Sequence, residues 1–420
     1  MFCNTPEYLY FCARSGWKMI LENCKMFSFD ISYSVILPVS PGDFLTQWED
    51  CLKQLQTQAE ESRYRIFKIN IFVHSTDKSN FLTKKEFIND TVLKAFGDEC
   101  PTFGILPISP EQHFDIEIEL SRVMSSGVII NFRKYENIGY TTLEKDGYKE
   151  LWANGIEDTK SISDTKNSAS LAFNLMRNIL LSEDMTFDNI VRQWNYIGSI
   201  LNTKRRKLII SQNYQVFNKV RFDNYSGYRQ IPGFPAATGV GMNYRGVVID
   251  FCAIRANDNI QIISVKNPRQ INPYNYDQNI LIGSPTLRQE NKQPPLFERA
   301  KLLTYNGKWR IFVSGTASII GQETIGIGDV EKQTLVSIEN IEKLICIENL
   351  VNNCPNLFFK TPNKYNHIRV YVKNAGDISL VKSICTNHFD NIPAIYLQAD
   401  ICRNDLLVEI EAEAISQENL

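Results

Sequence analysis

Two segments in distant parts of this chain repeat the same pattern, and the repeat limits the folds that the chain can adopt. "PTFGILPISPEQHFDIEIEL" begins at Pro101, and "PAIYLQADICRNDLLVEIEAEA" begins at Pro393. In both segments the sequence Glu-Ile-Glu starts sixteen residues after the first proline. A weaker copy begins at Pro235, where Asp250 lies within one residue of the equivalent position. A chain with such repeats is expected to fold into similar units that pack against one another.

The segments upstream of these copies repeat as well. "YTTLEKDGYKELWANGI" and "AKLLTYNGKWRIFVSGT" each read as two strands around a turn, at residues 146–147 and 306–307, where Asp-Gly and Asn-Gly favour a tight hairpin. Apolar residues at helical spacing follow in 169–181 and 329–345. The repeating unit is therefore two strands, a helix, a strand, a helix and a closing pair of strands. Two copies are complete, and we expect the first copy to lack its front half.

This pattern predicts an α+β fold in which helices cover one face of each sheet. No pattern in the first 25 residues joins the repeat, so we expect that segment to be an extension outside the folded units. The predicted segments are the N-terminal extension at 1–25, a partial unit at 26–135, a second unit at 136–265, a linker at 266–295 and a C-terminal unit at 296–420.

Glutamates line one face of the last predicted strand. Glu409, Glu411 and Glu413 alternate with aliphatic residues between positions 408 and 414. Because side chains of a strand alternate between the two faces of a sheet, the aliphatic set is expected to pack under the helices. The glutamates then point away from the helices, either toward water at a sheet edge or toward the place where the sheets of neighbouring units meet.

The composition excludes several classes of function. The 45 basic residues nearly balance the 47 acidic residues, and no long basic run is present, so a nucleic-acid partner is not expected. The four histidines are scattered and the ten cysteines form no CxxC pair, so we expect no zinc site. This cysteine content is typical of the reducing cytoplasm, and no apolar run reaches the ~20 residues of a membrane span.

Seven blocks of sequence follow one another in the chain: "RQWNYIGSI", "YQVFNKVRFDNY", "FPAATGVGM", "NPRQINPYNY", "FERAKLL", "VSGTASIIG" and "ADICRNDLLVEIE". The hairpin "ADICRNDLLVEIEAEA" with "SGTASI" resembles the YjgF/RidA-like fold. In this order, the seven blocks resemble the chorismatase family over about residues 34 to 415, and chorismatases are similar to fused units of the YjgF/RidA-like kind.

The resemblance implies an enzyme that removes the enolpyruvyl side chain of chorismate as pyruvate without a metal or organic cofactor. It implies that Glu409 is the acid and that Cys402 marks the branch that forms 3-hydroxybenzoate; relatives without this cysteine form a dihydroxycyclohexadiene carboxylate. An acid that protonates an enol ether at neutral pH needs a raised pKa. Burial between two sheets and the neighbouring charge of Glu411 would both raise the pKa of Glu409.

Chorismate carries two carboxylates, which arginine side chains bind well. Arg192 and Arg221 lie in two of the matching blocks and are candidate ligands. Tyr214 precedes Arg221 by seven residues, so both are expected on one face of a helix. Gly315 and Thr316 in "SGTASI" are candidates to offer backbone N–H groups and a hydroxyl to the substrate.

The chain also departs from the family. Gln322, Ile325 and Ile327 occupy the region where relatives carry histidines, which leaves open a different product or an inactive relative. A RidA-like deaminase is disfavoured, because "PAIYL" has Ile395 and Tyr396 where that activity needs an arginine. A third hypothesis is a non-catalytic protein that binds a metabolite. The expected partner is a small molecule bound by a monomer or a small homo-oligomer.

Overall fold

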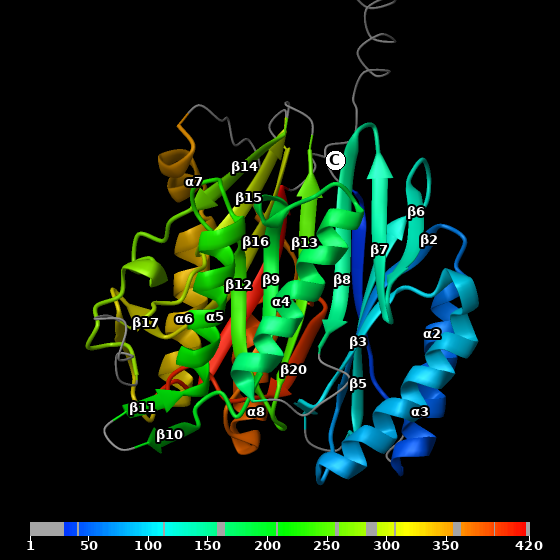
Figure 1. Ribbon diagram of the computed structural model, residues 1–420, viewed down its shortest axis with the longest axis horizontal. Helices are drawn as coiled ribbons and strands as arrows, with labels where there is room; N and C mark the ends of the chain where they lie inside the picture. The colour runs from blue at the N-terminus through cyan, green and yellow to red at the C-terminus, as the bar shows by residue number, and fades with distance from the viewer. Residues whose placement is uncertain are drawn as a thin grey trace, which may run out of the picture.

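The computed structural model describes residues 29–39, 42–111, 114–157, 164–206, 209–256, 260–282, 292–305, 308–355, 363–389 and 391–416 (Figure 1). The predicted N-terminal extension and the turn at 306–307 lie outside these residues. The described chain is α+β, as the sequence predicts, with three larger sheets and helices on their outer faces.

The first sheet is built from the N-terminal part of the chain and has the strand order β1-β5-β2-β3. Its elements are β1 (Ile31–Ile36), α2 (Phe44–Ala59), β2 (Tyr64–Val73), α3 (Lys78–Phe96), β3 (Thr102–Leu106) and β5 (Ile116–Met124).

The second sheet has the order β12-β9-β13-β8-β7-β6. Its elements are β6 (Ile129–Tyr135), β7 (Ile138–Lys145), β8 (Tyr148–Ile156), α4 (Thr165–Ser182), β9 (Ile190–Gly198), α5 (Asn213–Tyr228), β12 (Ala236–Met242) and β13 (Val247–Arg255). A separate two-stranded ribbon, β10 (Thr203–Arg206) with β11 (Ile209–Gln212), lies between β9 and α5 in the sequence.

The third sheet has the order β14-β15-β16-β21-β19-β20-β4. Its elements are β4 (Ser109–Pro110), β14 (Gln261–Val265), β15 (Ala300–Tyr305), β16 (Lys308–Ala317), α6 (Val330–Ile345), α7 (Ile347–Asn353), β19 (Asn363–Val372), α8 (Ile378–Phe389), β20 (Ala394–Gln398) and β21 (Val408–Ser416). The small hairpin of β17 (Ile319–Ile320) and β18 (Glu323–Thr324) follows β16.

The three sheets share one topology, which confirms the predicted repeat. In each sheet the last strand of the unit inserts between two earlier strands: β5 between β1 and β2, β13 between β8 and β9, and β21 between β16 and β19. The strand before it runs parallel to its neighbour in all three units. The prediction that the first copy lacks its front half was wrong, because β1 and α2 are present and only the counterpart of β7 and β15 is missing among the described residues.

Three short strands cross the predicted unit boundaries. The strand β6 falls in the range predicted for the first unit but pairs with β7 of the second sheet. Similarly, β14 pairs with β15, and β4 of the first unit pairs with β20 of the third sheet. Because each of these strands pairs with the sheet of another predicted unit, they connect the units. The unit boundaries taken from the sequence stay predictions.

Aspartate caps define the start of four helices, α2, α3, α4 and α6. Each aspartate accepts a hydrogen bond from the backbone N–H three residues later, which satisfies a donor that the helix leaves free; the caps are Asp43, Asp77, Asp164 and Asp329. The helix α5 lacks a side-chain cap. Instead, the backbone N–H groups of Asn213 and Tyr214 donate to carbonyls of Asn202 and Ile200 in the loop after β9.

The helices lie on the outside and the sheets meet in the middle, as Figure 1 shows for α2 and α3 on one side of the molecule and α6 and α7 on the opposite side. One apolar cluster lies under the helices of each unit. A fourth cluster joins all three sheets, with Phe67, Trp152, Trp194, Phe312 and Tyr371 among its members. The inner faces of the sheets are therefore buried against one another. None of the described helices is both long and apolar enough to span a membrane.

Candidate active site

A cavity lies between the second and third sheets. Its walls come from α5 and β12 on one side and from β16, β21 and the loop before β21 on the other. Tyr276 and residues 280–282 form a further wall. The space between these walls measures about 760 Å³, a value that includes open solvent at its mouth.

Glu409 of β21 lies on the wall of this cavity. The neighbours Val408 and Ile410 pack into the apolar cluster beneath the helices, so the alternation of the strand directs Glu409 to the inner face. Its side chain is buried, with an exposed fraction of 5%, and it makes no hydrogen bond to any other residue that the structure describes. This carboxyl group is therefore enclosed but not paired.

The environment of Glu409 favours its protonated form. Burial raises the pKa of this carboxyl from its ordinary value of 4.5 to about 8, and the charge of Glu411 adds to the rise. Arg192 and Arg299 act in the opposite direction but do not outweigh burial. With this pKa, the protonated form of Glu409 is favoured at neutral pH. The group can thus act as a proton donor toward a ligand in the cavity.

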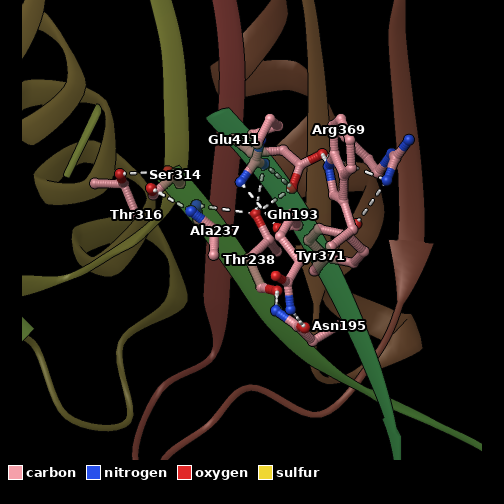
Figure 2. Close-up of polar contacts among 12 residues, drawn as sticks. Gln193, Asn195, Ala237, Thr238, Ser314, Thr316, Arg369, Tyr371 and Glu411 are labelled. Carbon is pink, nitrogen blue, oxygen red and sulfur yellow. Dashed lines mark hydrogen bonds and ion pairs between the residues drawn. The ribbon is translucent and has the colours of Figure 1, made fainter. Parts of the chain in front are cut away.

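Glu411 is buried on the same face but is fully paired, as Figure 2 shows. Its carboxylate accepts hydrogen bonds from Arg192 Nη2 at 2.9 Å, from Trp194 Nε1 at 2.7 Å and from the hydroxyl of Thr238. Burial alone would raise the pKa of Glu411, but the charges of Arg369 and Arg192 outweigh it and lower the pKa. Glu411 therefore stays ionised and places a fixed negative charge beside Glu409.

Glu413 is the third member of the acidic face and is also paired. It accepts from Arg310 Nη2 at 3.0 Å and from the Tyr33 hydroxyl at 2.7 Å. Burial would raise the pKa of Glu413, but the charge of Arg310 lowers it. Because Tyr33 belongs to the first sheet and Arg192 to the second, the acidic face lies where the three sheets meet. Of the two locations that the sequence left open, the structure has the one between the sheets.

The backbone of Gly315 makes room for the Glu409 carboxyl. A Cβ atom at this position would lie 1.9 Å from Glu409 Oε1, so a side chain here would displace the Glu409 carboxyl. The Gly315 N–H donates to the Thr238 hydroxyl at 3.0 Å, and the Thr316 hydroxyl donates to the Ser314 carbonyl at 2.8 Å (Figure 2). Thr316 is not on the cavity wall. Both groups are thus used within the protein, so the geometry does not favour the predicted role of these two residues as donors to the substrate, and that role stays a prediction.

Tyr214 and Arg221 lie together on the cavity wall, as their spacing on α5 predicts. The Tyr214 ring packs against Gly239 of β12, where a Cβ atom would lie 3.3 Å from the ring. The guanidinium of Arg221 is 2% exposed and donates from Nη2 to Asn218 at 2.8 Å. Its Nε has no hydrogen-bond partner among the described residues.

Cys402 lies on the same wall as Glu409. Burial raises the pKa of its thiol to about 12, and the charge of Glu409 adds to the effect. The group is therefore a neutral thiol at physiological pH. This state does not suit a nucleophile, because the thiolate is the reactive form. Cys402 can instead shape the cavity beside the acid.

Arg192 does not line this cavity. It is 2% exposed, and its Nη2 is engaged by both Glu411 and Thr238, the latter at 2.7 Å. It lies behind the cavity wall and holds Glu411 in its ionised form. The geometry does not favour the predicted role of Arg192 as a ligand of the substrate, and its effect on the site passes through Glu411.

Three further residues of the wall were not selected from the sequence. Arg299 donates from Nη2 to the Tyr276 hydroxyl at 2.7 Å, and the guanidinium of Arg403 lies 5.0 Å from the centre of the Tyr276 ring. Arg299 Nε and Arg403 Nη2 have no hydrogen-bond partner within the described part of the chain. Arg299 lies in the "FERAKLL" block and Arg403 follows Cys402, so the blocks did contain a signal for both.

The side chains near the cavity do not resemble a metal centre. Among the residues described by the structure, no group of three or more His, Cys, Asp or Glu side chains is arranged to hold a metal ion. The seven cysteines in the described ranges are free thiols.

Comparisons with known proteins support the resemblance seen in the sequence. Residues 134–253 match the family described as Chorismatase FkbO/Hyg5-like, N-terminal. This region contains β9 and α5 but ends before Cys402 and Glu409.

Two curated relatives extend this match. A 3-hydroxybenzoate synthase of Streptomyces hygroscopicus is 32% identical over 237 residues, which are 55% of this chain and 65% of the relative. A chorismatase of Streptomyces rapamycinicus is 34% identical over 230 residues, which are 54% of this chain and 64% of the relative. The matched region thus spans less than two thirds of the length of each relative.

The fold can be compared over a longer range. A crystal structure of a chorismatase superimposes with a TM-score of 0.64 at 20% sequence identity, and the match covers 92% of this chain and 98% of that structure. Residues 134–253 thus match a chorismatase family model, the chain is similar in sequence to a 3-hydroxybenzoate synthase and a chorismatase over about half its length, and its fold is similar to that of a chorismatase.

Proposed function

We propose that this protein cleaves chorismate to pyruvate and 3-hydroxybenzoate, with Glu409 as the general acid. The observation that carries the proposal is an enclosed carboxyl group on a cavity wall whose pKa is raised to about 8. An enol ether is cleaved after its terminal carbon is protonated, and this step requires a carboxylic acid rather than a carboxylate.

The protonation state of the acid depends on its neighbour. Glu411 is ionised because Arg192 and Arg369 stabilise its charge, so the proton of the pair resides on Glu409. Two carboxyl groups with different environments can in this way take different roles in one site. After protonation of the enol ether, the cleaved side chain leaves as pyruvate, and the ring forms the aromatic product.

Arginine side chains around the cavity support the binding of a dicarboxylate. Arg221, Arg299 and Arg403 lie on the wall, and each has an N–H group without a partner among the described residues. A buried donor without a partner is costly, and a bound carboxylate would satisfy it with a charge-assisted hydrogen bond. The apolar part of the wall, which includes Phe297 and Leu406, suits the ring of the substrate.

Cys402 is proposed to direct the product. As a neutral thiol beside Glu409, it fills space next to the ring without adding charge. By keeping water away from the ring, it leaves the ring's own C4 hydroxyl oxygen to attack C3 as the C3–O bond to the side chain breaks and pyruvate departs. The hydroxyl proton is lost in this step, and the resulting epoxide then opens at C4, takes up a proton on oxygen and loses the C3 hydrogen as a proton to give 3-hydroxybenzoate. Hydrolysis to a dihydroxycyclohexadiene carboxylate is the alternative outcome on the same site.

The test is incubation of the purified protein with chorismate, followed by detection of pyruvate and identification of the second product by mass spectrometry. Pyruvate with 3-hydroxybenzoate would support the proposal, and pyruvate with the dihydroxycyclohexadiene carboxylate would support the hydrolytic alternative. Chorismate that binds but stays intact would overturn both and leave a protein that binds the metabolite. A cytoplasmic location and the oligomeric state stay predictions of the sequence.

A further inference from the structure

The turn between β17 and β18 connects two parts of the cavity wall, although it does not itself line the cavity. Gly321, with a φ of 62°, and Gln322 form the turn, and Gln322 is only partly exposed. The Gly321 backbone donates to the carbonyl of Arg269 at 2.8 Å and accepts from Ile271 N–H at 2.9 Å. The turn therefore anchors the start of the segment that leads to Tyr276.

Gln322 itself makes contacts on two sides. Its Oε1 accepts from the backbone N–H of Asp277 at 3.0 Å, and its Nε2 donates to the carboxylate of Asp277. Its backbone carbonyl accepts from Arg403 Nη1 at 2.7 Å. One residue thus holds both the segment that begins at Tyr276 and the arginine that follows Cys402.

Both of these parts face the cavity. The segment contributes Tyr276 and residues 280–282 to the wall, and Arg403 lies over the Tyr276 ring. The Tyr276 hydroxyl accepts from Arg299. Tyr276 therefore contacts two arginines of the wall, and its position depends on how firmly its neighbour Asp277 is held.

We propose that Gln322 is a positioning residue that fixes the Tyr276–Ile282 segment and Arg403 over the cavity and thereby sets the affinity for the substrate. The inference rests on the proposed function for the identity of the substrate, whereas the contacts of Gln322 do not depend on it. The amide suits this task because it accepts from the Asp277 backbone and donates to the Asp277 carboxylate at the same time.

The test reverses the side-chain hydrogen bond between Gln322 and Asp277, so that residue 277 becomes the donor and residue 322 the acceptor. In Gln322→Glu the new carboxylate cannot donate to Asp277 and repels it, so we expect KM for chorismate to rise about tenfold with a smaller change in kcat, as for the loss of a charge-assisted hydrogen bond. In Gln322→Glu with Asp277→Asn, the asparagine can donate to the new carboxylate. The double variant should therefore recover KM to within about threefold of the wild type.

Glu323→Gln serves as the matched control, because this exposed neighbour on the same hairpin changes the local charge without touching Asp277. An unchanged KM in Gln322→Glu, or a raised KM that Asp277→Asn does not rescue, would overturn the inference.

Hydrogen exchange gives a readout that is independent of activity. Amide exchange in the peptide spanning residues 276–282 should become faster in Gln322→Glu and return toward the wild type in the double variant. If wild-type protein leaves chorismate intact, the proposed function fails, yet the exchange result still decides whether Gln322 holds the segment. Unchanged exchange in Gln322→Glu would overturn the positioning role itself.

Discussion

The substitution Glu409→Gln removes the acidic proton of the site without changing the shape of the site. Glutamine keeps the size of the side chain and occupies the same space beside Gly315, but it has no proton of suitable acidity to donate. We expect pyruvate release from chorismate to fall by at least about 100-fold, which is the contribution typical of a general acid. Wild-type activity should be highest on the acid side of pH 8 and should decline above it, since the pKa of Glu409 is raised to about 8.

The substitution Glu409→Gln should also make the protein more stable at neutral pH. The carboxyl of Glu409 has a pKa of about 8 in the folded chain and about 4.5 when solvated, so the folded state binds its proton more tightly. The protonated Glu409 carboxyl therefore contributes its full stability to the fold below pH 4.5, and this contribution is lost as the pH rises to about 8. Relative to a side chain that cannot ionise, the carboxyl destabilises the fold by up to ~3 kcal/mol at pH 7 and by ~1 kcal/mol at pH 5.

Denaturation of wild type and Glu409→Gln at both pH values tests this difference, together with the rate of pyruvate release. The matched control is Glu413→Gln, on the same strand and face. This variant removes one of the two carboxylates paired with Arg310, and Glu150 keeps the other pair. It should therefore lower the stability at pH 7, but by less than the ~3 kcal/mol expected when a buried charge loses its whole partner. Near wild-type turnover in Glu409→Gln would refute the acid assignment. A stability difference that is the same at pH 5 and pH 7 would show that Glu409 is not held protonated.

Three further predictions concern the same cavity. Cys402→Ala should keep releasing pyruvate while the product shifts from 3-hydroxybenzoate toward the dihydroxycyclohexadiene carboxylate, which mass spectrometry can quantify; an unchanged product would contradict the directing role. Gly315→Ala should lower activity at least about tenfold and reduce thermal stability, because its Cβ would overlap the Glu409 carboxyl. Activity should survive treatment with EDTA, and loss that a divalent ion reverses would show that the chemistry needs a metal.

The sequence determined the architecture to a large extent. The repeated prolines and the Glu-Ile-Glu pattern predict similar α+β units, and the three sheets do share one topology. The prediction succeeded because alternation and helical spacing are local properties that each unit must satisfy to bury its apolar residues. The first unit was judged too short because the strand at Ile31–Ile36 and the helix after it have no similar sequence in the other copies.

The alternation pattern does not predict which of the three glutamates acts as the acid. Glu409, Glu411 and Glu413 are equivalent by spacing, and only the resemblance singled out Glu409. In the structure, Glu411 and Glu413 are paired with Arg192 and Arg310, and Glu409 is not paired. The three glutamates therefore differ because of the arginines that surrounding strands bring to them.

The same reason explains where the geometry departs from the predicted site. Arg192 was expected to bind the substrate, but the fold places its guanidinium against Glu411, to which it donates a hydrogen bond. Arg299 and Arg403 were not selected, although the fold brings both to Tyr276. The sequence by itself determined the units and the acidic strand, because these depend on neighbours along the chain. The tertiary structure decided which charges are paired and which face the cavity, because pairing and pKa depend on distances between segments far apart in the sequence.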